Sequence, residues 1–428
     1  MPKVPSTQEF DPYEGNALIA GLGPILPRLD VAKRLIELPP KPPPDIASVP
    51  KHIRMHLLMA VLDLHLPSLE EQRLFETIDL MIRQNYDRLS PLAPSTWSHI
   101  SGQSATTNQP LRATPSAAAV VGISGTGKSE AISRCLSLYP NQVIRHDSFF
   151  RMVNGLTQPL FLSLNAPFNG KADQLGLDLM IAYRQATGST RFDEALESRS
   201  KQNGPKLLRE WLQVASSHFL GLLHIDEIQN LFKLATVASR KHRNPGSRAP
   251  ELRIVEDETL KWILTFLNTS RIPLLISGTP DGMSAIQTRI SNTQRLTSFG
   301  HHVFKHFEGD NESTFKQHWL PRLVLYQYVA RPLAPSDELV DLILTKTGGV
   351  QRLIIALWIA AHRVAFERKD DDLRLEDFQT AADTNFALVS GAVDALRSND
   401  PRRLERYEDL YPRDPGLWAQ IFGPTLGP

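Results

Sequence analysis

One octapeptide constrains the fold of this chain more than any other feature: Gly122-Ile123-Ser124-Gly125-Thr126-Gly127-Lys128-Ser129 fits G-x-x-x-x-G-K-[ST] at every fixed position. An apolar run at 117–121 precedes it and is typical of a buried strand, and apolar residues at helical spacing follow it. In a strand–loop–helix context, backbone N–H groups and the helix N-terminus bind phosphate. The sequence therefore predicts a site for nucleotide phosphates.

The residues of this phosphate-binding loop have distinct expected roles. Lys128 is expected to reach the β- and γ-phosphates and to take part in catalysis, and the Ser129 hydroxyl is expected to ligate Mg²⁺. An Asn-Lys-x-Asp motif, which reads guanine, is absent from the sequence, so ATP is expected rather than GTP. The residues of this segment assigned to nucleotide binding are Gly122, Ser124, Gly125, Thr126, Gly127, Lys128, Ser129 and Glu130.

An acidic pair follows a second buried strand, predicted at 219–225. Open α/β sheets place their sites at the C-terminal ends of strands. We therefore expect Asp226 to hold Mg²⁺, largely through water, and Glu227 to polarise the attacking water. We also expect this strand to lie next to the strand that leads into the phosphate-binding loop.

A third predicted strand, 272–277, ends in Ser277-Gly278-Thr279-Pro280. Ser277 and Thr279 each qualify to contact the γ-phosphate or to orient water, and the sequence does not separate them. A turn that simply uses Gly-Thr-Pro is the structural alternative.

Phosphoryl transfer needs positive charge at the γ-phosphate, often from an arginine of a neighbouring subunit. Arg289 and Arg295 are the candidates for this catalytic role, and we favour Arg295. Arg352, at the start of a predicted helix after Gly348-Gly349, is positioned to reach the nucleotide from within the same chain. For each of these three arginines, the alternative is an ordinary solvated position on the protein surface with no role in catalysis.

Composition narrows the class of protein further. The net charge is +1, so nucleic acid would have to be bound by local patches rather than by a global field. The single cysteine, Cys135, excludes a disulfide within one chain. The N-terminus lacks the pattern of a signal peptide, and no run approaches the ~18 apolar residues of a membrane span. We expect a soluble, cytoplasmic α/β protein.

The order of predicted elements gives the domain organisation. Strands alternate with helices, including strand-like stretches at 142–149 and 158–164, and this alternation predicts a parallel sheet covered on both faces. The N-terminal segment is mostly helical and is interpreted either as a partner-docking module or as a structural extension. The expected units are 1–110 (extension and linker), 111–308 (nucleotide-binding domain), 309–390 (helical lid) and 391–428 (charged tail).

Together these features resemble the AAA+ ATPases, which are P-loop NTPases, and within them the TniB and TnsC transposition ATPases. The narrower resemblance rests on two stretches. Residues 13–19, Tyr-Glu-Gly-Asn-Ala-Leu-Ile, are similar to a Y-x-x-N-P-L-I opening, with Ala17 in place of the usual proline. Residues 224–229, His-Ile-Asp-Glu-Ile-Gln, are similar to the acidic motif of these proteins.

The resemblance implies a regulator that binds ATP and Mg²⁺ and assembles as a ring or helical filament on double-stranded DNA. It would link a target selector of the TniQ or TnsD type to the transposase, and ATP hydrolysis would disassemble it. DNA contacts are expected from Lys171, Arg240, Lys241 and Arg243, and a solvated basic loop is the alternative. Two other functions stay open: a clamp-loader or initiator-like AAA+ ATPase, and an ATP-gated scaffold with negligible turnover.

Overall fold

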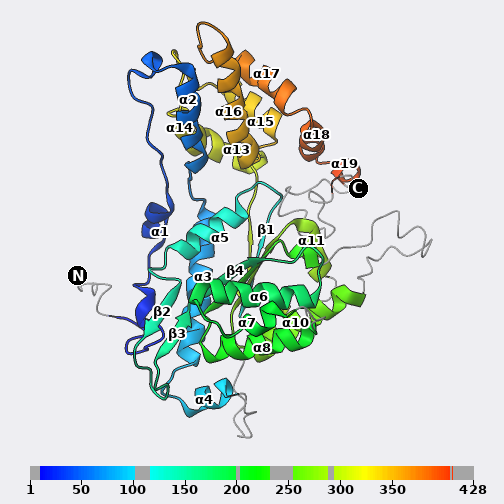
Figure 1. Cartoon of the computed structure of the whole chain (residues 1–428). Coiled ribbons are helices and arrows are strands. Elements are labelled where there is room, and N and C mark those ends of the chain that lie inside the picture. The colour runs from blue at the N-terminus through cyan, green and yellow to red at the C-terminus, as the bar shows by residue number, and fades with distance from the viewer. Residues whose placement is uncertain are drawn as a thin grey trace, which may run out of the picture.

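The computed structural model describes residues 10–101, 116–198, 203–231, 254–287, 294–404 and 407. Its centre is one parallel five-stranded sheet with the order β4-β5-β6-β1-β7 (Figure 1). The strands are β1 (Ala117–Val121), β4 (Phe161–Asn165), β5 (Leu222–Asp226), β6 (Leu274–Gly278) and β7 (His301–Val303). Every residue of β1, β5 and β6 is buried, as expected for central strands that are covered on both faces.

Helices cover both faces of this sheet, and the alternation of side chains along β1 assigns them. Ala118 and Val120 pack with helices α3 (Leu69–Arg88) and α5 (Lys128–Ser137). Ala117, Ala119 and Val121 pack on the other face with α6 (Ala172–Thr187), α8 (Gly204–Ser217) and α10 (Ile254–Thr269). The expected α/β architecture, a parallel sheet flanked by helices, is confirmed.

Two expectations about the strands are wrong. The stretch predicted at 142–149 forms β2 (Val143–His146), which does not join the sheet. It pairs antiparallel with β3 (Leu156–Pro159), because the connection at 147–155 is shorter than the crossover of about a dozen residues that parallel pairing requires. The stretch predicted at 158–164 does enter the parallel sheet, as β4. The strand of the acidic pair, β5, does not neighbour β1: β6 lies between them and pairs with both. Since β6 is apolar on both faces, it fits this central position as well as β5 does.

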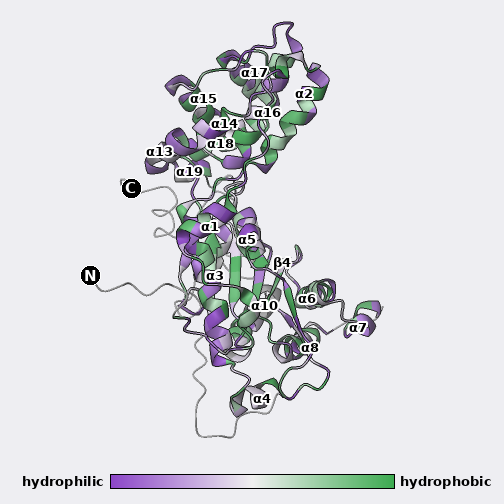
Figure 2. Cartoon of the chain, turned by 90° about the vertical axis from the view of Figure 1, so that its left-hand side faces the viewer, coloured by the Kyte–Doolittle hydropathy of each residue, from purple (hydrophilic) through white to green (hydrophobic). Residues whose placement is uncertain are grey.

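A helical domain follows the sheet and forms the upper lobe of Figure 2, where it is seen apart from the sheet. Its long helices are α15 (Asp337–Thr347), α16 (Gln351–Glu367) and α17 (Leu375–Asn385). The remaining elements are η5 (Gly309–Asn311), α13 (Glu312–Thr314), η6 (Phe315–Trp319), α14 (Leu320–Leu323), α18 (Ser390–Ser398) and α19 (Pro401–Leu404). Elements α18 and α19 fall largely in the expected charged tail, yet Leu396 and Leu404 are buried in the core of the sheet domain.

The N-terminal segment contacts both lobes. Helix α1 (Arg28–Leu35) packs with α3 and α5 on the sheet, whereas α2 (Lys51–Leu58) packs against α16 in the helical domain (Figure 1). The shorter elements of this segment are η1 (Ala20–Leu22), η2 (Ile46–Ser48), η3 (Met59–Asp63) and α4 (Pro94–Ile100). The chain thus crosses from one lobe to the other and back before β1 begins.

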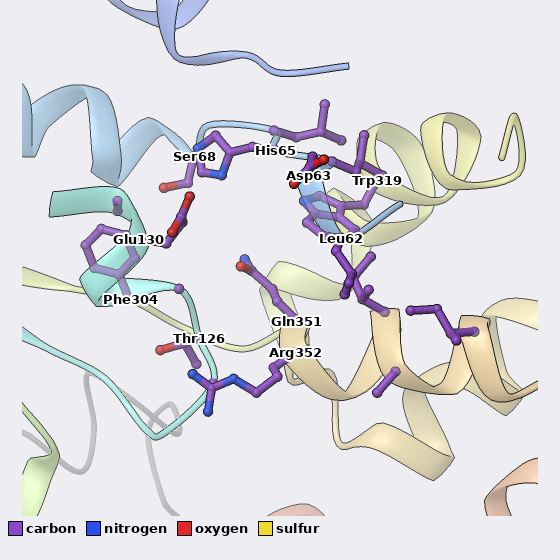
Figure 3. Close-up of a pocket in the computed structure, with 18 of the residues that line it drawn as sticks. Leu62, Asp63, His65, Ser68, Thr126, Glu130, Phe304, Trp319, Gln351 and Arg352 are labelled. Carbon is purple, nitrogen blue, oxygen red and sulfur yellow. The ribbon is translucent and has the colours of Figure 1, made fainter. Parts of the chain in front are cut away.

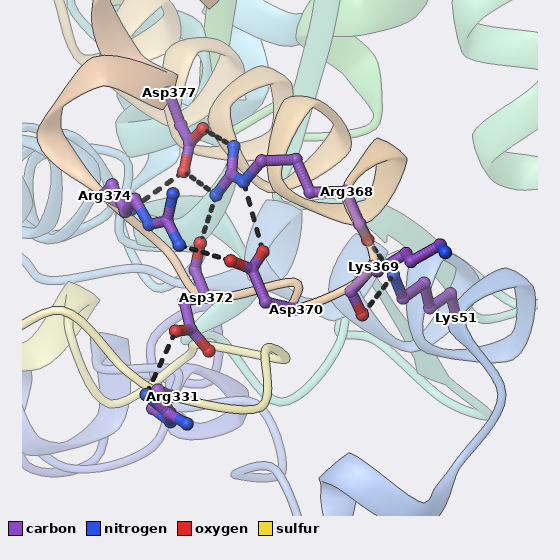
Figure 4. Close-up of polar contacts among 8 residues, drawn as sticks. All are labelled: Lys51, Arg331, Arg368, Lys369, Asp370, Asp372, Arg374 and Asp377. Carbon is purple, nitrogen blue, oxygen red and sulfur yellow. Dashed lines mark hydrogen bonds and ion pairs between the residues drawn. The ribbon is translucent and has the colours of Figure 1, made fainter.

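Polar contacts fix α2 to the helical domain. The Lys51 ammonium group donates to the carbonyl oxygen of Arg368, and the Arg368 guanidinium donates to both carboxylate oxygens of Asp377 (Figure 4). The side chain of Arg54, which is buried, donates to the carbonyl oxygen of Tyr328 at 3.0 Å and pairs with Asp371.

In the described part of the chain, no single helix has the length and apolar character of a membrane span. The helices α15 and α16 meet that test only as a pair, which is bent by 115°.

Candidate nucleotide site

The phosphate-binding loop joins the end of β1 to the start of α5. Gly125 and Gly127 have φ values of +87° and +85°, which residues with a Cβ rarely adopt. The Thr126 hydroxyl and the Lys128 ammonium group both donate to the carbonyl oxygen of Ile123, at 2.9 and 3.0 Å. The Lys128 side chain therefore folds back onto the loop that precedes α5.

The acidic residue Asp226 lies next to this loop. The Ser129 hydroxyl donates to Asp226 Oδ2 at 2.5 Å, and the Ser277 hydroxyl and the Glu227 backbone N–H donate to Oδ1 at 2.5 and 2.8 Å. Burial by itself raises the pKa of Asp226, but these hydrogen bonds outweigh burial and lower the pKa. An ionised carboxylate beside a hydroxyl oxygen is a donor set that suits Mg²⁺, so Ser129 and Asp226 are brought together as the sequence predicts.

Glu227 directly follows Asp226 and is exposed. Its φ is +52°, in the left-handed region that residues with a Cβ rarely adopt. The Asn230 side-chain amide donates to Glu227 Oε2 at 3.2 Å. The carboxylate expected to polarise water thus lies at the rim of the site.

The structure separates the two candidates at the end of β6. Ser277 is fully buried and its hydroxyl contacts Asp226, as described above. The Thr279 hydroxyl instead donates to Asp281 at 2.5 Å, at the start of α11 (Pro280–Gln287). Only Ser277 contacts the acidic residue of the site.

A buried histidine that the sequence reasoning did not use lies behind Ser277. The two ring nitrogens of His224 contact the hydroxyl oxygens of Ser163 and Ser277, each at 2.8 Å. Burial lowers the pKa of His224 to about 4, so the ring is neutral at pH 7. A single polar residue within an apolar strand was the signal available in the sequence.

A cavity of about 790 Å³ opens beside the loop, between the two lobes (Figure 3). Thr126 and Gly127 of the loop line it, as do Gln351 and Arg352 of α16. Figure 3 shows Arg352 beside Thr126. The Arg352 backbone N–H donates to the carbonyl oxygen of Gly125 at 3.2 Å. Apolar side chains line part of the cavity: Leu62, Leu64, Leu66, Ala131, Phe304, Trp319, Ile355, Ala356, Ile359, Ala360 and Phe386. Polar and charged side chains line the rest: Asp63, His65, Ser68, Glu71, Glu130, Arg134, Arg363 and Asn385. The sequence did not associate residues 62–66 or Trp319 with this site.

The other basic candidates have different positions. Arg295 is exposed on a short helical turn at 294–296. Lys171 is also exposed and directly precedes α6, on the loop that follows β4. Arg289, Arg240, Lys241 and Arg243 lie outside the described residues.

Comparisons with known proteins give one match to a protein family. A family model described as an AAA domain matches residues 111–286. No curated protein matches the chain in sequence. One similar solved structure is that of Drosophila ORC bound to DNA, with 14% identity and a TM-score of 0.36, covering 81% of this chain and 80% of that chain. The family match, the sheet order and the loop together show that the chain contains an AAA domain with the P-loop NTPase fold.

Proposed function

We propose that this protein is an ATPase that binds ATP together with Mg²⁺ and hydrolyses it. The observation that carries the proposal is the contact between the Ser129 hydroxyl and Asp226 at 2.5 Å, directly beside a glycine loop that follows β1. Ser129 and Asp226 would hold Mg²⁺, which when bound neutralises charge on the phosphate oxygens. These two residues come from different elements, α5 and β5, and meet only in the folded chain.

The surrounding residues would share the remaining tasks. The backbone N–H groups of the loop and the Lys128 ammonium group would bind the phosphates. Glu227, at the rim, would accept a proton from the attacking water. An arginine supplied by a second subunit, with Arg295 favoured, would add positive charge during hydrolysis. The exposed position of Arg295 is compatible with a contact between subunits.

The cavity beside the loop is the proposed site for the adenine base. It adjoins Thr126 and Gly127, so a nucleotide whose phosphates lie on the loop would extend into it. Burying a planar ring against Trp319 and the aliphatic side chains of α16 would add affinity that the phosphates alone do not provide. Because the lining comes from both lobes, nucleotide binding would join the sheet domain to the helical domain.

We further propose, on the sequence resemblance of residues 13–19 and 224–229, that the protein is a cytoplasmic regulator of DNA transposition. In this role it would assemble as an oligomer on target DNA and link a target selector to the transposase. Lys171, together with Arg240, Lys241 and Arg243, would contact DNA phosphates, which makes binding independent of sequence and sensitive to salt.

One experiment tests both the proposed ATPase activity and the proposed role on DNA. It measures ATP turnover with and without duplex DNA across a salt series, with particles imaged under the same conditions. Turnover that is stimulated by DNA, with rings or filaments that form on DNA only with ATP, is the expected result. Turnover without any response to DNA would retain the ATPase and reject the DNA-targeting role. Nucleotide-dependent assembly without turnover would instead favour a scaffold.

A further inference from the structure

We propose that His224 is a positioning residue that holds the Ser277 hydroxyl on Asp226 and thereby keeps the Asp226 carboxylate oriented toward Ser129. This inference rests on the proposed ATPase function, because it assigns a task within that site. The contacts involved run across three strands, from Ser163 on β4 through His224 on β5 to Ser277 on β6.

The contacts determine which ring nitrogen carries the proton. Ser277 has one hydroxyl proton, and its oxygen lies 2.5 Å from an ionised carboxylate that can only accept, so that proton is donated to Asp226. The Ser277 oxygen must then accept a hydrogen bond from His224 Nε2, 2.8 Å away. A neutral imidazole that carries its proton on Nε2 accepts a hydrogen bond at Nδ1, and the Ser163 hydroxyl donates that hydrogen bond.

This arrangement gives Ser277 a defined task. Its proton is committed to Asp226, so Ser277 orients the carboxylate and does not donate to the γ-phosphate. His224 fixes the direction of the Ser277 hydrogen bond. Because Nε2–H donates to the Ser277 oxygen, the Ser277 proton points away from His224 and toward Asp226. His224 is 2% exposed and Ser277 is fully buried, so water cannot easily replace either contact.

The first test needs no nucleotide and no hydrolysis. A nitrogen-edited NMR spectrum of the histidine rings, with the His224 signals identified by their loss in His224→Gln, reports the tautomer directly. We expect a neutral ring protonated only at Nε2. A ring protonated at Nδ1, or one that exchanges between tautomers, would overturn the proposal even if the protein hydrolyses ATP.

The second test uses two amides that replace different nitrogens of the ring. The side-chain amide of His224→Gln reaches the position of Nε2 and can still donate to Ser277, whereas that of His224→Asn reaches only the position of Nδ1. We expect kcat to fall by about 10- to 100-fold in the Asn variant and to be largely retained in the Gln variant, with similar ATP affinity in both. Ser277→Ala should match the Asn variant.

The outcomes distinguish failure of the positioning role of His224 from failure of the proposed ATPase function. Equal kcat in the Asn and Gln variants, both folded by circular dichroism, would mean that His224 only fills space. Wild-type protein that does not hydrolyse ATP would reject the proposed ATPase, while the NMR measurement would still decide the hydrogen-bond arrangement. Loss of ATP affinity in the Asn variant, with kcat unchanged, would also contradict the positioning role.

Discussion

Arg54 and Asp371 form an ion pair whose side chains are only 4% and 5% exposed, and the pair joins α2 of the N-terminal segment to the turn after α16. The Arg54 guanidinium also lies 5.2 Å from the ring centroid of Phe366. A buried charge without its partner is costly, so the N-terminal segment and the helical domain are expected to be stable only together.

Replacing Arg54 by alanine should therefore destabilise the protein strongly. Removing one member of a buried pair costs about 3–5 kcal/mol. The matched control is Arg28→Ala, which breaks a pair with Glu76 that is 49% and 34% exposed and should cost far less stability, because solvent screens an exposed pair. Chemical denaturation of both variants measures the difference, and equal losses would contradict the structural role of α2.

The phosphate-binding loop yields a prediction that separates binding from turnover. Lys128→Ala should weaken ATP binding by about 10- to 100-fold, since a charge-assisted hydrogen bond contributes about 1.5–3 kcal/mol. Glu227→Gln should bind ATP normally and lose about 10²- to 10⁴-fold in kcat, because it removes the proton acceptor. Calorimetry and a phosphate-release assay measure the two effects. Normal turnover in Glu227→Gln would exclude Glu227 as the base.

The cavity can be tested by filling it. Ala356 lines the cavity on the exposed face of α16, so Ala356→Trp should occupy the space without disturbing the core. We expect ATP affinity to fall by about tenfold or more, roughly 1.4 kcal/mol, with little change in the binding of tripolyphosphate. Ala356→Ser is the control of similar size. If Ala356→Trp binds ATP as tightly as the wild type does, the base lies elsewhere.

Stability should fall in mild acid because of His362. Burial lowers the pKa of this side chain to about 4 from its usual 6.5, although its Nδ1 contact with the Trp358 carbonyl oxygen opposes the shift. Below pH 6.5 the unfolded chain binds the proton and the folded chain does not, so the free energy of unfolding decreases as pH falls from 6.5 to 4. The size of this effect is about 3 kcal/mol.

The measurement for His362 is chemical denaturation at several pH values between 4 and 7. His362→Leu should reduce the slope of stability against pH in this range, whatever its effect at pH 7. The exposed His52 provides the control, and His52→Leu should leave the slope unchanged. An unaltered slope in His362→Leu would show that the folded chain accepts the proton at this position.

The local part of the nucleotide site could be predicted from the amino-acid sequence. Residues 122–129 combine a fixed spacing with a strand before and a helix after, and these are properties of neighbouring residues. The apolar runs that lead into Asp226 and Ser277 likewise require buried strands, so their polar ends must lie at one edge of a parallel sheet. For this reason the sequence predicts that Ser129 and Asp226 share one Mg²⁺ site.

Which distant segments contact one another could not be predicted from the sequence and is seen in the folded chain. The placement of β6 between β1 and β5, and the hydrogen bonds that select Ser277 over Thr279, depend on contacts between residues far apart in the chain. The lining of the cavity by residues 62–66, and the burial of Arg54 against Asp371, depend on how two lobes share one N-terminal segment. Hydrophobic spacing specifies which face of an element is buried but not what covers that face, because burial is non-directional.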